Sequence, residues 1–342
     1  MKDALTYDDV LLVPQYSDIK SRKEVSLSVE LGNGITLESP ILSSPMDTVT
    51  ESEMAAVMSI VGGSGIIHRY NSIEDQAELV SRAKSLAVGP VGAAIGVTGD
   101  YLDRASALTL SGASILCVDV AHGHHVLVKD ALTELRNMFG DHIHIMAGNV
   151  ATLEAFNDLA DWGANSIRCN IGGGSICTTR IQTGHGVPGL QTIIDCAKSD
   201  RDALIIADGG LKTSGDITKA IAAGADLVML GSLLSGTDES PGEVVSSLEN
   251  PALKYKRYRG MASKAAQEDW KGTFSSLEGV SSTVPYKGAV VNILDDLLRG
   301  IRSGLSYSGC RSISEFHSKA QFVRQTAAGQ IESSAHINRV SR

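Results

Sequence analysis

Residues 224–232, GADLVMLGS, show the pattern that the whole chain repeats. A Gly-Ala pair leads into a short apolar run, and two small residues, Gly231 and Ser232, follow it. Short apolar runs bounded by turn residues are typical of buried parallel strands, and helix-like segments between them are typical of crossover helices. Eight such runs occur in the sequence, at 40–44, 64–67, 91–96, 114–120, 143–147, 165–170, 203–207 and 226–231.

The segments between the runs carry helix start and stop signals. Thr152 can cap a helix that Gly163 ends, and Thr213 or Ser214 can cap a helix that Gly224 ends. Eight strand–helix units with short connections favour an α/β fold of the (β/α)8 TIM barrel type. An open doubly wound sheet is the alternative that this pattern leaves open.

We expect a single barrel domain over residues 1–342, without an inserted regulatory domain. Four further parts are expected around the barrel: an N-terminal arm (about 1–39, with a hairpin between 23 and 40), a mobile flap (about 258–288), a last helix (about 289–303) and a polar C-terminal tail (about 304–342).

Composition excludes several classes of protein. The net charge is −9 and aromatic residues make up 4% of the chain, which argues against a nucleic-acid partner. One local exception is the basic run at Lys254, Lys256, Arg257 and Arg259, which is either solvated surface or an aid to phosphate binding. No apolar run reaches the roughly 20 residues that span a bilayer, so no membrane partner is expected.

The five cysteines have neither metal-site nor disulfide spacing. Cys117 and Cys169 lie within apolar runs and are expected to be buried. No signal peptide opens the sequence, so the cytoplasm is the expected compartment.

Polar residues and glycines collect after the predicted strands. In a barrel, these positions share the C-terminal face, where catalytic groups lie. They are Ser44–Asp47, His68-Arg69, Asp119, His122–His125, Gly148-Asn149, the loop 170–188, Asp208–Gly210 and Gly231-Ser232. The last two groups follow strands seven and eight, whose loops commonly form a phosphate site.

The loop 170–188, NIGGGSICTTRIQTGHGVP, holds the strongest candidate nucleophile, Cys177. Three glycines expose backbone amides beside it, and Arg180 brings a positive charge, and both features stabilise a thiolate. The alternative is a neutral cysteine that takes no part in chemistry.

Four other candidates each have a plainer explanation. Asp208 is either a turn residue or a carboxylate that binds ribose hydroxyls, and Asp119 is either a solvated strand end or a second ribose ligand. Glu278 in the flap is either an exposed side chain or part of a proton relay. A metal site at the His122, His124 and His125 cluster is disfavoured, because no carboxylate or cysteine lies at suitable spacing.

Taken together, these loops resemble the family of IMP dehydrogenases and GMP reductases. The matching motifs run through nearly the whole chain: TYDDVLLVPQYS (6–17), SSPMDTVTE (43–51), GIIHRY (65–70), VDVAHGH (118–124), AGNVAT (147–152), GGGSICTTR (172–180), IADGG (206–210), GS (231–232), YRGM (258–261) and VPYKG (284–288).

The resemblance implies a nicotinamide-dependent enzyme that acts on a purine nucleotide, GMP or IMP, and that is expected to form a homotetramer. Cys177 would attack C2 of the purine, with Thr179 beside it and Glu278 completing a proton relay. The remaining roles would be 5′-phosphate binding (Ser175, Gly210, Gly231, Ser232, Tyr258), ribose binding (Asp208), packing on the nucleotide (Ser44, Met46), contact with the base (Gly260, Met261) and the nicotinamide side (Asp119, Asn149, Arg168).

The cysteine loop departs from the family pattern at two positions. Asn170 and Gly173 stand where a glycine and a proline are common. The resemblance also implies a potassium ion on the carbonyls of Gly172, Gly174 and Cys177, and the departures are expected to alter loop rigidity and potassium binding.

The flap sequence favours one of the two reactions. Both would pass through a covalent thioimidate at C2, but only a dehydrogenase must hydrolyse it, with a flap Arg-Tyr pair. Residues 262–283 contain neither arginine nor tyrosine and retain Glu278. This favours GMP reductase, with NADPH as the expected cofactor.

Other features support IMP dehydrogenase with NAD⁺, which is the alternative. The tail at Ala327–Ile337, AAGQIESSAHI, resembles the dehydrogenase terminus, where Glu332–Ser334 of a neighbouring subunit would help bind potassium. SPGE (240–243) is also dehydrogenase-like. Lys271 could take the place of the flap arginine, although a lysine holds its proton too tightly to be a ready base. The third hypothesis is that the protein is a homologue that binds a nucleotide without catalytic activity.

Overall fold

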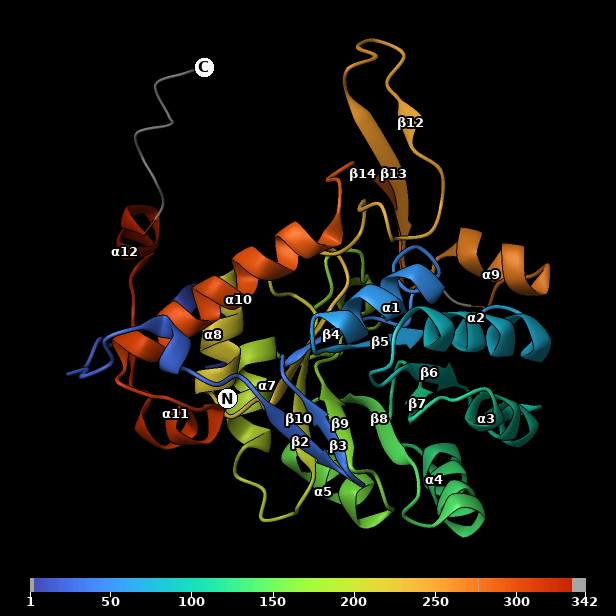
Figure 1. Cartoon of the computed structure of the whole chain (residues 1–342), viewed down its shortest axis with the longest axis horizontal. Coiled ribbons are helices and arrows are strands. Elements are labelled where there is room, and N and C mark those ends of the chain that lie inside the picture. Colours follow the sequence, from blue (N-terminus) through green and yellow to red (C-terminus); the bar gives the residue numbers. More distant parts are fainter. Residues whose placement is uncertain (1–2, 276, 334–342) are drawn as a thin grey trace.

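A closed barrel of eight parallel strands forms the centre of the molecule (Figure 1). The computed structural model describes residues 3–275 and 277–333. The first barrel strand pairs with the last, with Ile41 opposite Val228, so the sheet is a barrel and not an open sheet. In ring order the strands are β4 (Ile41–Ser43), β5 (Ser64–Ile67), β6 (Gly92–Ile95), β7 (Ile115–Asp119), β8 (His144–Val150), β9 (Ser166–Cys169), β10 (Leu204–Asp208) and β11 (Leu227–Leu230).

The eight predicted apolar runs are these eight strands, so the predicted barrel is confirmed. Their residues are almost all buried, because one face fills the barrel and the other faces the helices. Cys117 and Cys169 are both fully buried, as predicted.

Helices cover the outside of the barrel. Thr152 accepts a hydrogen bond from the Ala155 N–H (3.2 Å), and Thr213 accepts one from the Asp216 N–H (3.1 Å), so Thr213 is the cap and Ser214 is not. The helices are α1 (Ser52–Ile60), α2 (Ile73–Leu86), α3 (Tyr101–Leu110), α4 (Val126–Phe139), α5 (Leu153–Asp161), α7 (Gly189–Cys196), α8 (Ser214–Ala222) and α10 (Val290–Tyr307), with a short α6 (Thr179–Thr183) in the cysteine loop.

A hairpin of β2 (Val29–Gly32) and β3 (Ile35–Leu37) closes the N-terminal end of the barrel. It is shorter than the predicted span of 23–40. His144, at the start of β8, donates from Nδ1 to the Leu31 carbonyl (2.9 Å) and accepts from the Ser166 hydroxyl at Nε2 (2.7 Å). Burial lowers the pKa of His144 to about 4, so the ring is neutral and ties the hairpin to two strands.

The two end regions of the chain differ most from expectation. β1 (Val10–Leu12) pairs antiparallel with β15 (Phe322–Arg324), so the N-terminal arm and the tail form one small sheet. Helix α10 runs to Tyr307, past the predicted end at 303, and α11 (Ile313–Lys319) and α12 (Ala327–Glu332) follow. The tail is therefore folded over its described part, because Ile313 and Phe316 bury apolar surface against the core.

A sheet that begins before the predicted flap and overlaps it projects from the barrel mouth (Figure 1). Its strands are β12 (Val245–Ser246), β13 (Lys254–Arg259) and β14 (Ser281–Pro285), and α9 (Lys264–Lys271) lies between the last two. The basic run on β13 alternates: Lys254 and Arg257 are exposed, whereas Lys256 and Arg259 are buried and hydrogen-bonded. Only two of the four basic residues of this run therefore belong to the solvated surface. None of the described helices is long and apolar enough to cross a bilayer.

Candidate active site

One pocket of about 360 Å³ opens at the C-terminal ends of the barrel strands, a volume in the range of small-ligand sites. All the residues to which the family resemblance assigns a role within one subunit line it. They are Ser44, Met46, Asp119, Asn149, Arg168, Gly172, Gly174, Ser175, Cys177, Thr179, Asp208, Gly210, Gly231, Ser232, Tyr258, Gly260, Met261 and Glu278. Other positions that the sequence singled out do not line it, namely Asp47, His68, His122–His125 and Arg180.

Cys177 is the first member of a three-residue chain of polar contacts. Its Sγ lies 3.2 Å from the Thr179 hydroxyl, which donates to Oε2 of Glu278 at 2.7 Å. Because the Thr179 hydroxyl donates its hydrogen bond to the carboxylate, its oxygen can accept a hydrogen bond from the Cys177 thiol. The three groups can therefore pass a proton between sulfur and carboxylate.

The flap and the cysteine loop meet through backbone hydrogen bonds. Thr178 N–H donates to the Glu278 carbonyl (3.1 Å), and Val280 N–H donates to the Ile176 carbonyl (3.1 Å). The Thr178 hydroxyl also donates to the Leu277 carbonyl (2.9 Å). These bonds place Glu278 beside Thr179, so the carboxylate reaches the nucleophile only while this flap segment lies on the loop.

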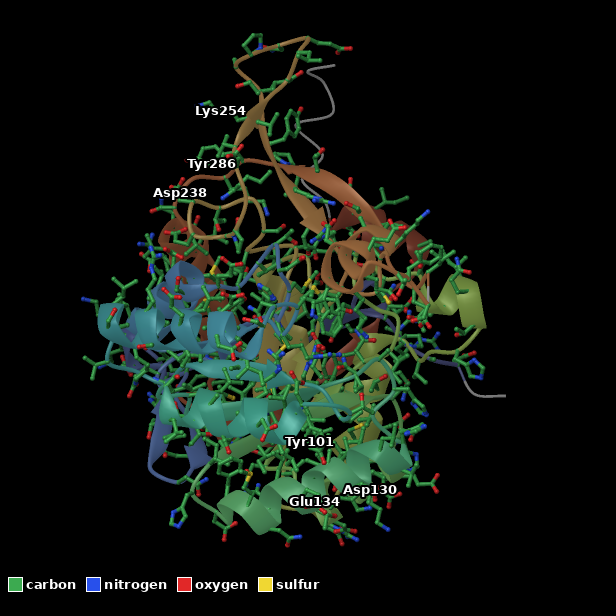
Figure 2. The ribbon with its side chains drawn as sticks, turned by 90° about the vertical axis from the view of Figure 1, so that its right-hand side faces the viewer. Tyr101, Asp130, Glu134, Asp238, Lys254 and Tyr286 are labelled. Carbon is green, nitrogen blue, oxygen red and sulfur yellow. The ribbon has the colours of Figure 1, made fainter. Side chains whose placement is uncertain are left out.

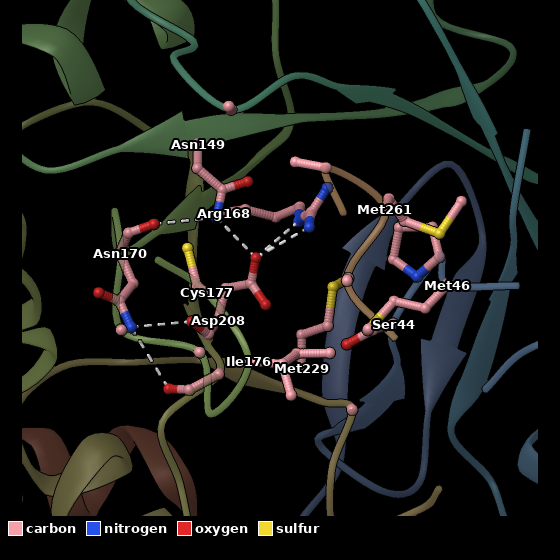
Figure 3. Close-up of a pocket in the computed structure, with 18 of the residues that line it drawn as sticks. Ser44, Met46, Asn149, Arg168, Asn170, Ile176, Cys177, Asp208, Met229 and Met261 are labelled. Carbon is pink, nitrogen blue, oxygen red and sulfur yellow. Dashed lines mark hydrogen bonds and ion pairs between the residues drawn. The ribbon is translucent and has the colours of Figure 1, made fainter. Parts of the chain in front are cut away.

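Four strand ends supply a charged network to the same pocket, and Figure 3 shows three of its members, Asn149, Arg168 and Asp208. Arg168 on β9 donates to Asp208 on β10 (3.0 Å) and to Asp119 on β7 (2.5 Å). Asn149 on β8 donates to the same Asp208 oxygen, Oδ2, at 2.6 Å. Burial opposes the charge of Arg168, yet the two carboxylates and the Cys117 thiol raise its pKa well above the ordinary value. Among the described residues, Oδ1 of Asp208 receives no donor, so it is available to a ligand.

The two departures from the family pattern are neighbours in space. Asn170 has φ of +151°, a conformation that favours glycine. Its side-chain Nδ2 donates to the Asp208 carbonyl (3.0 Å), and its own carbonyl accepts from Asn149 (3.0 Å), so it fastens the loop to the strand ends. A Cβ at Gly173 would meet that Nδ2 at 2.1 Å. A larger residue at 173 therefore cannot coexist with Asn170 as it stands.

The expected phosphate residues form a neutral cradle. Tyr258 is 4% exposed, and Ser175 and Ser232 line the same pocket and act on its hydroxyl. Burial raises the pKa of Tyr258 above its ordinary value, so the phenol stays protonated. Gly210 has φ of +75°, and a Cβ there would meet the Gly173 carbonyl at 2.7 Å, which explains why glycine is required.

Sequence reasoning missed an ion pair that joins two walls of the pocket. Arg259 donates to Oδ2 of Asp47 from Nε (2.9 Å) and from Nη2 (2.5 Å), and it also contacts Asp269 on α9. Asp47 follows Met46, and Arg259 precedes Gly260 and Met261. The pair therefore fixes the spacing between the segments expected to hold the nucleotide, and it gives no signal in sequence because its partners lie 212 residues apart.

An aromatic and cationic cluster was missed as well. Tyr70 stacks on Trp270 of α9, with ring centroids 4.1 Å apart, and donates its hydroxyl to the Met261 carbonyl (2.9 Å). Arg69 lies 5.6 Å from both ring centroids and donates to the Asp119 carbonyl (3.1 Å). The motif GIIHRY contains two of these residues, but only packing reveals that α9 completes the cluster.

One of the carbonyls expected to bind potassium already accepts a hydrogen bond. Backbone carbonyls are suitable ligands for a hard cation. However, the Gly174 carbonyl already accepts the Cys177 N–H at 3.1 Å, so one of the three expected ligands, Gly172, Gly174 and Cys177, is partly engaged. Ser334, expected to contribute from a neighbouring subunit, lies outside the described residues, as do residues 335–337 of that tail motif. Potassium binding stays a prediction.

Two histidines of the 122–125 cluster contact protein groups that are unrelated to metal binding. His124 contacts Asp158 at 2.7 Å, and His125 caps α4 by accepting from the Leu127 N–H (3.2 Å). Within residues 3–275 and 277–333, no group of three or more His, Cys, Asp or Glu side chains is arranged to hold a metal ion.

A parallel barrel whose mouth combines a cysteine relay with a carboxylate network defines a class that comparison with known proteins identifies. The family model described as the IMP dehydrogenase / GMP reductase domain matches residues 4–336. The chain therefore belongs to the IMP dehydrogenase / GMP reductase family of oxidoreductases.

Some relatives are named IMP dehydrogenases and others GMP reductases. The chain is 35% identical to an inosine-5′-monophosphate dehydrogenase of Nitrosopumilus maritimus, over 98% of each protein. It is also 35% identical to a GMP reductase of Leishmania major, over 98% of this chain and 97% of the relative. A variant of the Trypanosoma brucei GMP reductase, solved with guanosine 5′-monophosphate, superposes with a TM-score of 0.91 at 33% identity, over 98% of each chain. These similarities show the family and do not separate the two reactions.

Proposed function

We propose that this protein is a GMP reductase, which converts GMP to IMP and ammonia with NADPH. The observation that carries the proposal is the composition and placement of the flap. Residues 262–283 contain no arginine or tyrosine to activate water, whereas Glu278 contacts Thr179 at 2.7 Å. The site thus keeps a group that can protonate a leaving amine and lacks one that can generate hydroxide.

The residues of the chain supply the covalent and proton-transfer steps. The Cys177 thiolate adds to C2 of GMP, and the C2–N bond breaks as the amine takes a proton and leaves as ammonia, so that a thioimidate remains. The relay from Glu278 through Thr179 delivers that proton. When bound, NADPH supplies the hydride that reduces C2, after which the C2–S bond breaks and IMP and the thiolate are released.

The pocket walls supply the binding steps in this proposal. Oδ1 of Asp208 would accept a ribose hydroxyl, since its other oxygen is already held by Arg168 and Asn149. Ser175, Gly210, Gly231, Ser232 and Tyr258 would bind the 5′-phosphate. Asp119, Asn149 and Arg168 would lie on the nicotinamide side, where the network between β7 and β10 keeps them in place.

The second candidate, IMP dehydrogenase with NAD⁺, draws on the SPGE segment at 240–243 and on the equal identity to relatives of either name. An absorbance assay at 340 nm decides between them. Purified protein with GMP and NADPH should lose absorbance and release one ammonia per NADPH. A gain of absorbance with IMP and NAD⁺, together with XMP, would replace the proposal with the dehydrogenase. No change with either pair would favour a silent homologue.

The proposal also includes a cytoplasmic homotetramer and a requirement for potassium. Light scattering at micromolar protein should give a mass four times the 36.0 kDa of the chain.

The potassium requirement has its own test. Turnover should fall when potassium chloride is replaced by an equal concentration of tetramethylammonium chloride. Unchanged turnover would remove potassium from the proposal without affecting the reaction.

A further inference from the structure

The phosphate cradle has no positive charge of its own. Its proposed members are two serines, two glycines and a tyrosine: Ser175, Ser232, Gly210, Gly231 and Tyr258. A phosphate monoester carries about −1.5 to −2 charges at pH 7. Removing such a group from water is costly unless charge or strong donors compensate. A cation just outside the cradle would meet that need.

Lys287 lies behind the turn that forms one side of the cradle. Its Nζ donates to the carbonyls of Ser232 (2.7 Å) and Leu233 (3.1 Å). The same turn is closed by Leu234 N–H and Ser235 N–H, which both donate to the Gly231 carbonyl (3.0 and 2.9 Å). Gly231 and Ser232 line the pocket, so one turn of backbone separates the ammonium group from the phosphate position.

The backbone of Lys287 is also fixed to this loop. Lys287 N–H donates to the Gly236 carbonyl (2.8 Å), and the neighbouring Tyr286 hydroxyl donates to Asp238 (2.5 Å). Figure 2 shows Tyr286 and Asp238 close together at the base of the projecting sheet, with Lys254 farther toward its tip. Lys287 therefore cannot drift from the turn without breaking contacts at both its ends.

A comparison with Lys256 shows that the charge of Lys287 is uncompensated. Lys256 is 3% exposed and also donates to carbonyls, those of Thr237 (2.9 Å) and Ser240 (2.5 Å). Burial lowers the pKa of Lys256, and the nearby charges of Asp238 and Glu239 partly oppose that shift. Lys287 forms no ion pair with a carboxylate among the residues that the structure describes. Its side chain keeps exposed surface, and the partial burial of its ammonium group lowers its pKa.

We propose that Lys287 is a positioning residue for the substrate phosphate: it supplies, through the Ser232–Leu233 backbone, the positive charge that makes the pocket prefer a 5′-phosphorylated purine over the bare nucleoside. The carbonyls of the turn point to the ammonium group, so their peptide dipoles are oriented with the positive ends away from it. The charge of Lys287 thus acts on the cradle through this turn of backbone. This inference rests on the proposed nucleotide site, but not on which reaction follows.

Charge and hydrogen bonding can be separated by substitution. Lys287→Gln keeps an N–H donor for the two carbonyls and removes the charge, whereas Lys287→Arg keeps both. Lys254→Gln is the matched control, because Lys254 is an exposed lysine of β13 with no side-chain hydrogen bond in the described structure. Titration calorimetry with GMP, IMP and guanosine measures the preference, and inorganic phosphate as a competitor of GMP gives a readout that involves no base.

Loss of one unit charge from behind this turn should weaken GMP and IMP binding roughly tenfold in Lys287→Gln, and phosphate should compete less well by a similar factor. Guanosine binding should be unchanged, and Lys287→Arg and Lys254→Gln should behave as wild type. Equal weakening of GMP and guanosine, or no weakening of GMP, would overturn the role of Lys287. If the wild type itself binds neither nucleotide better than guanosine, the proposed nucleotide site fails instead.

Discussion

The two halves of the pocket are held together in different ways. Asp119, Asn149, Arg168 and Asp208 stand on four adjacent barrel strands, and their side chains bond directly to one another. We call this the strand half. Cys177, Thr179 and Glu278, the flap half, come from a loop and a separate flap that meet through a few hydrogen bonds. The strand half is built into the barrel, whereas the flap half exists only when two segments lie together.

This difference separates binding from the choice of reaction. In the proposed mechanism, the strand half would bind a nucleotide in either enzyme of the family, since nothing in it is specific to hydrolysis or to amine release. The flap half would decide what happens to the thioimidate, and it can change by substitutions in a segment outside the barrel core. Four substitutions test how independent the two halves are.

Cys177→Ala should have the largest effect, on the flap half alone. Turnover should fall by about 10⁴-fold or more, because no other residue can form the thioimidate. GMP affinity, measured by calorimetry, should stay within about threefold of wild type, since the strand half and the cradle are intact. Turnover like that of wild type would show that Cys177 is not the nucleophile.

Arg168→Met should break the strand half. The variant leaves Asp119 and Asp208 in a buried site without their guanidinium partner, and we expect it to lower the free energy of unfolding by about 3–5 kcal/mol. Denaturant unfolding measures this. Arg201→Met is the matched control: Arg201 pairs with Asp161 at the surface (2.8 Å), where the loss should be under about 1 kcal/mol. Equal losses would mean that the buried network is not structurally important.

Glu278→Gln should sharpen the contrast, because it affects rate without affecting stability. The amide still accepts from Thr179 but binds no proton, so kcat should fall by about 10²-fold. The free energy of unfolding should change by no more than about 0.5 kcal/mol. Glu268→Gln on α9 is the control and should leave kcat unchanged. A large fall in stability would instead make Glu278 a structural tie between flap and loop.

Gly173→Ala should have the smallest effect of the four, at the junction of the halves. The added Cβ meets Asn170 Nδ2 at 2.1 Å, and the forced shift should cost roughly 1–2 kcal/mol of stability. Asn170→Gly removes the obstructing side chain and suits the observed φ. A double-mutant cycle measured by unfolding should therefore show the double variant losing less than the sum of the two single variants. If the stability losses of the two single variants simply add in the double variant, the side chains at 170 and 173 do not interact.

The sequence predicted those features that depend on short segments. The eight apolar runs identified the barrel strands because a buried strand is apolar on both faces, and the motifs named residues that the structure brings into one pocket. The tie between Asp47 and Arg259 and the stack of Tyr70 on Trp270 were not predictable. Each joins segments about 200 residues apart, and neither has a local pattern.

The same limit applies to single residues. Lys256 and Lys287 are indistinguishable from surface lysines in the sequence, since only the path of the loop 232–240 shows that backbone carbonyls surround them. Asn170 could be recognised as an unusual residue for its position, but its link to Gly173 required the backbone geometry of the loop.

The pairing of β1 with β15 has a consequence for how the chain reaches its final state. Val10 lies opposite Arg324, so β1 can pair only after the whole barrel sequence and β15 have been made. Bringing such distant segments together costs more chain entropy than any pairing between neighbouring barrel strands. We therefore expect the β1–β15 sheet to form last, after the barrel has folded.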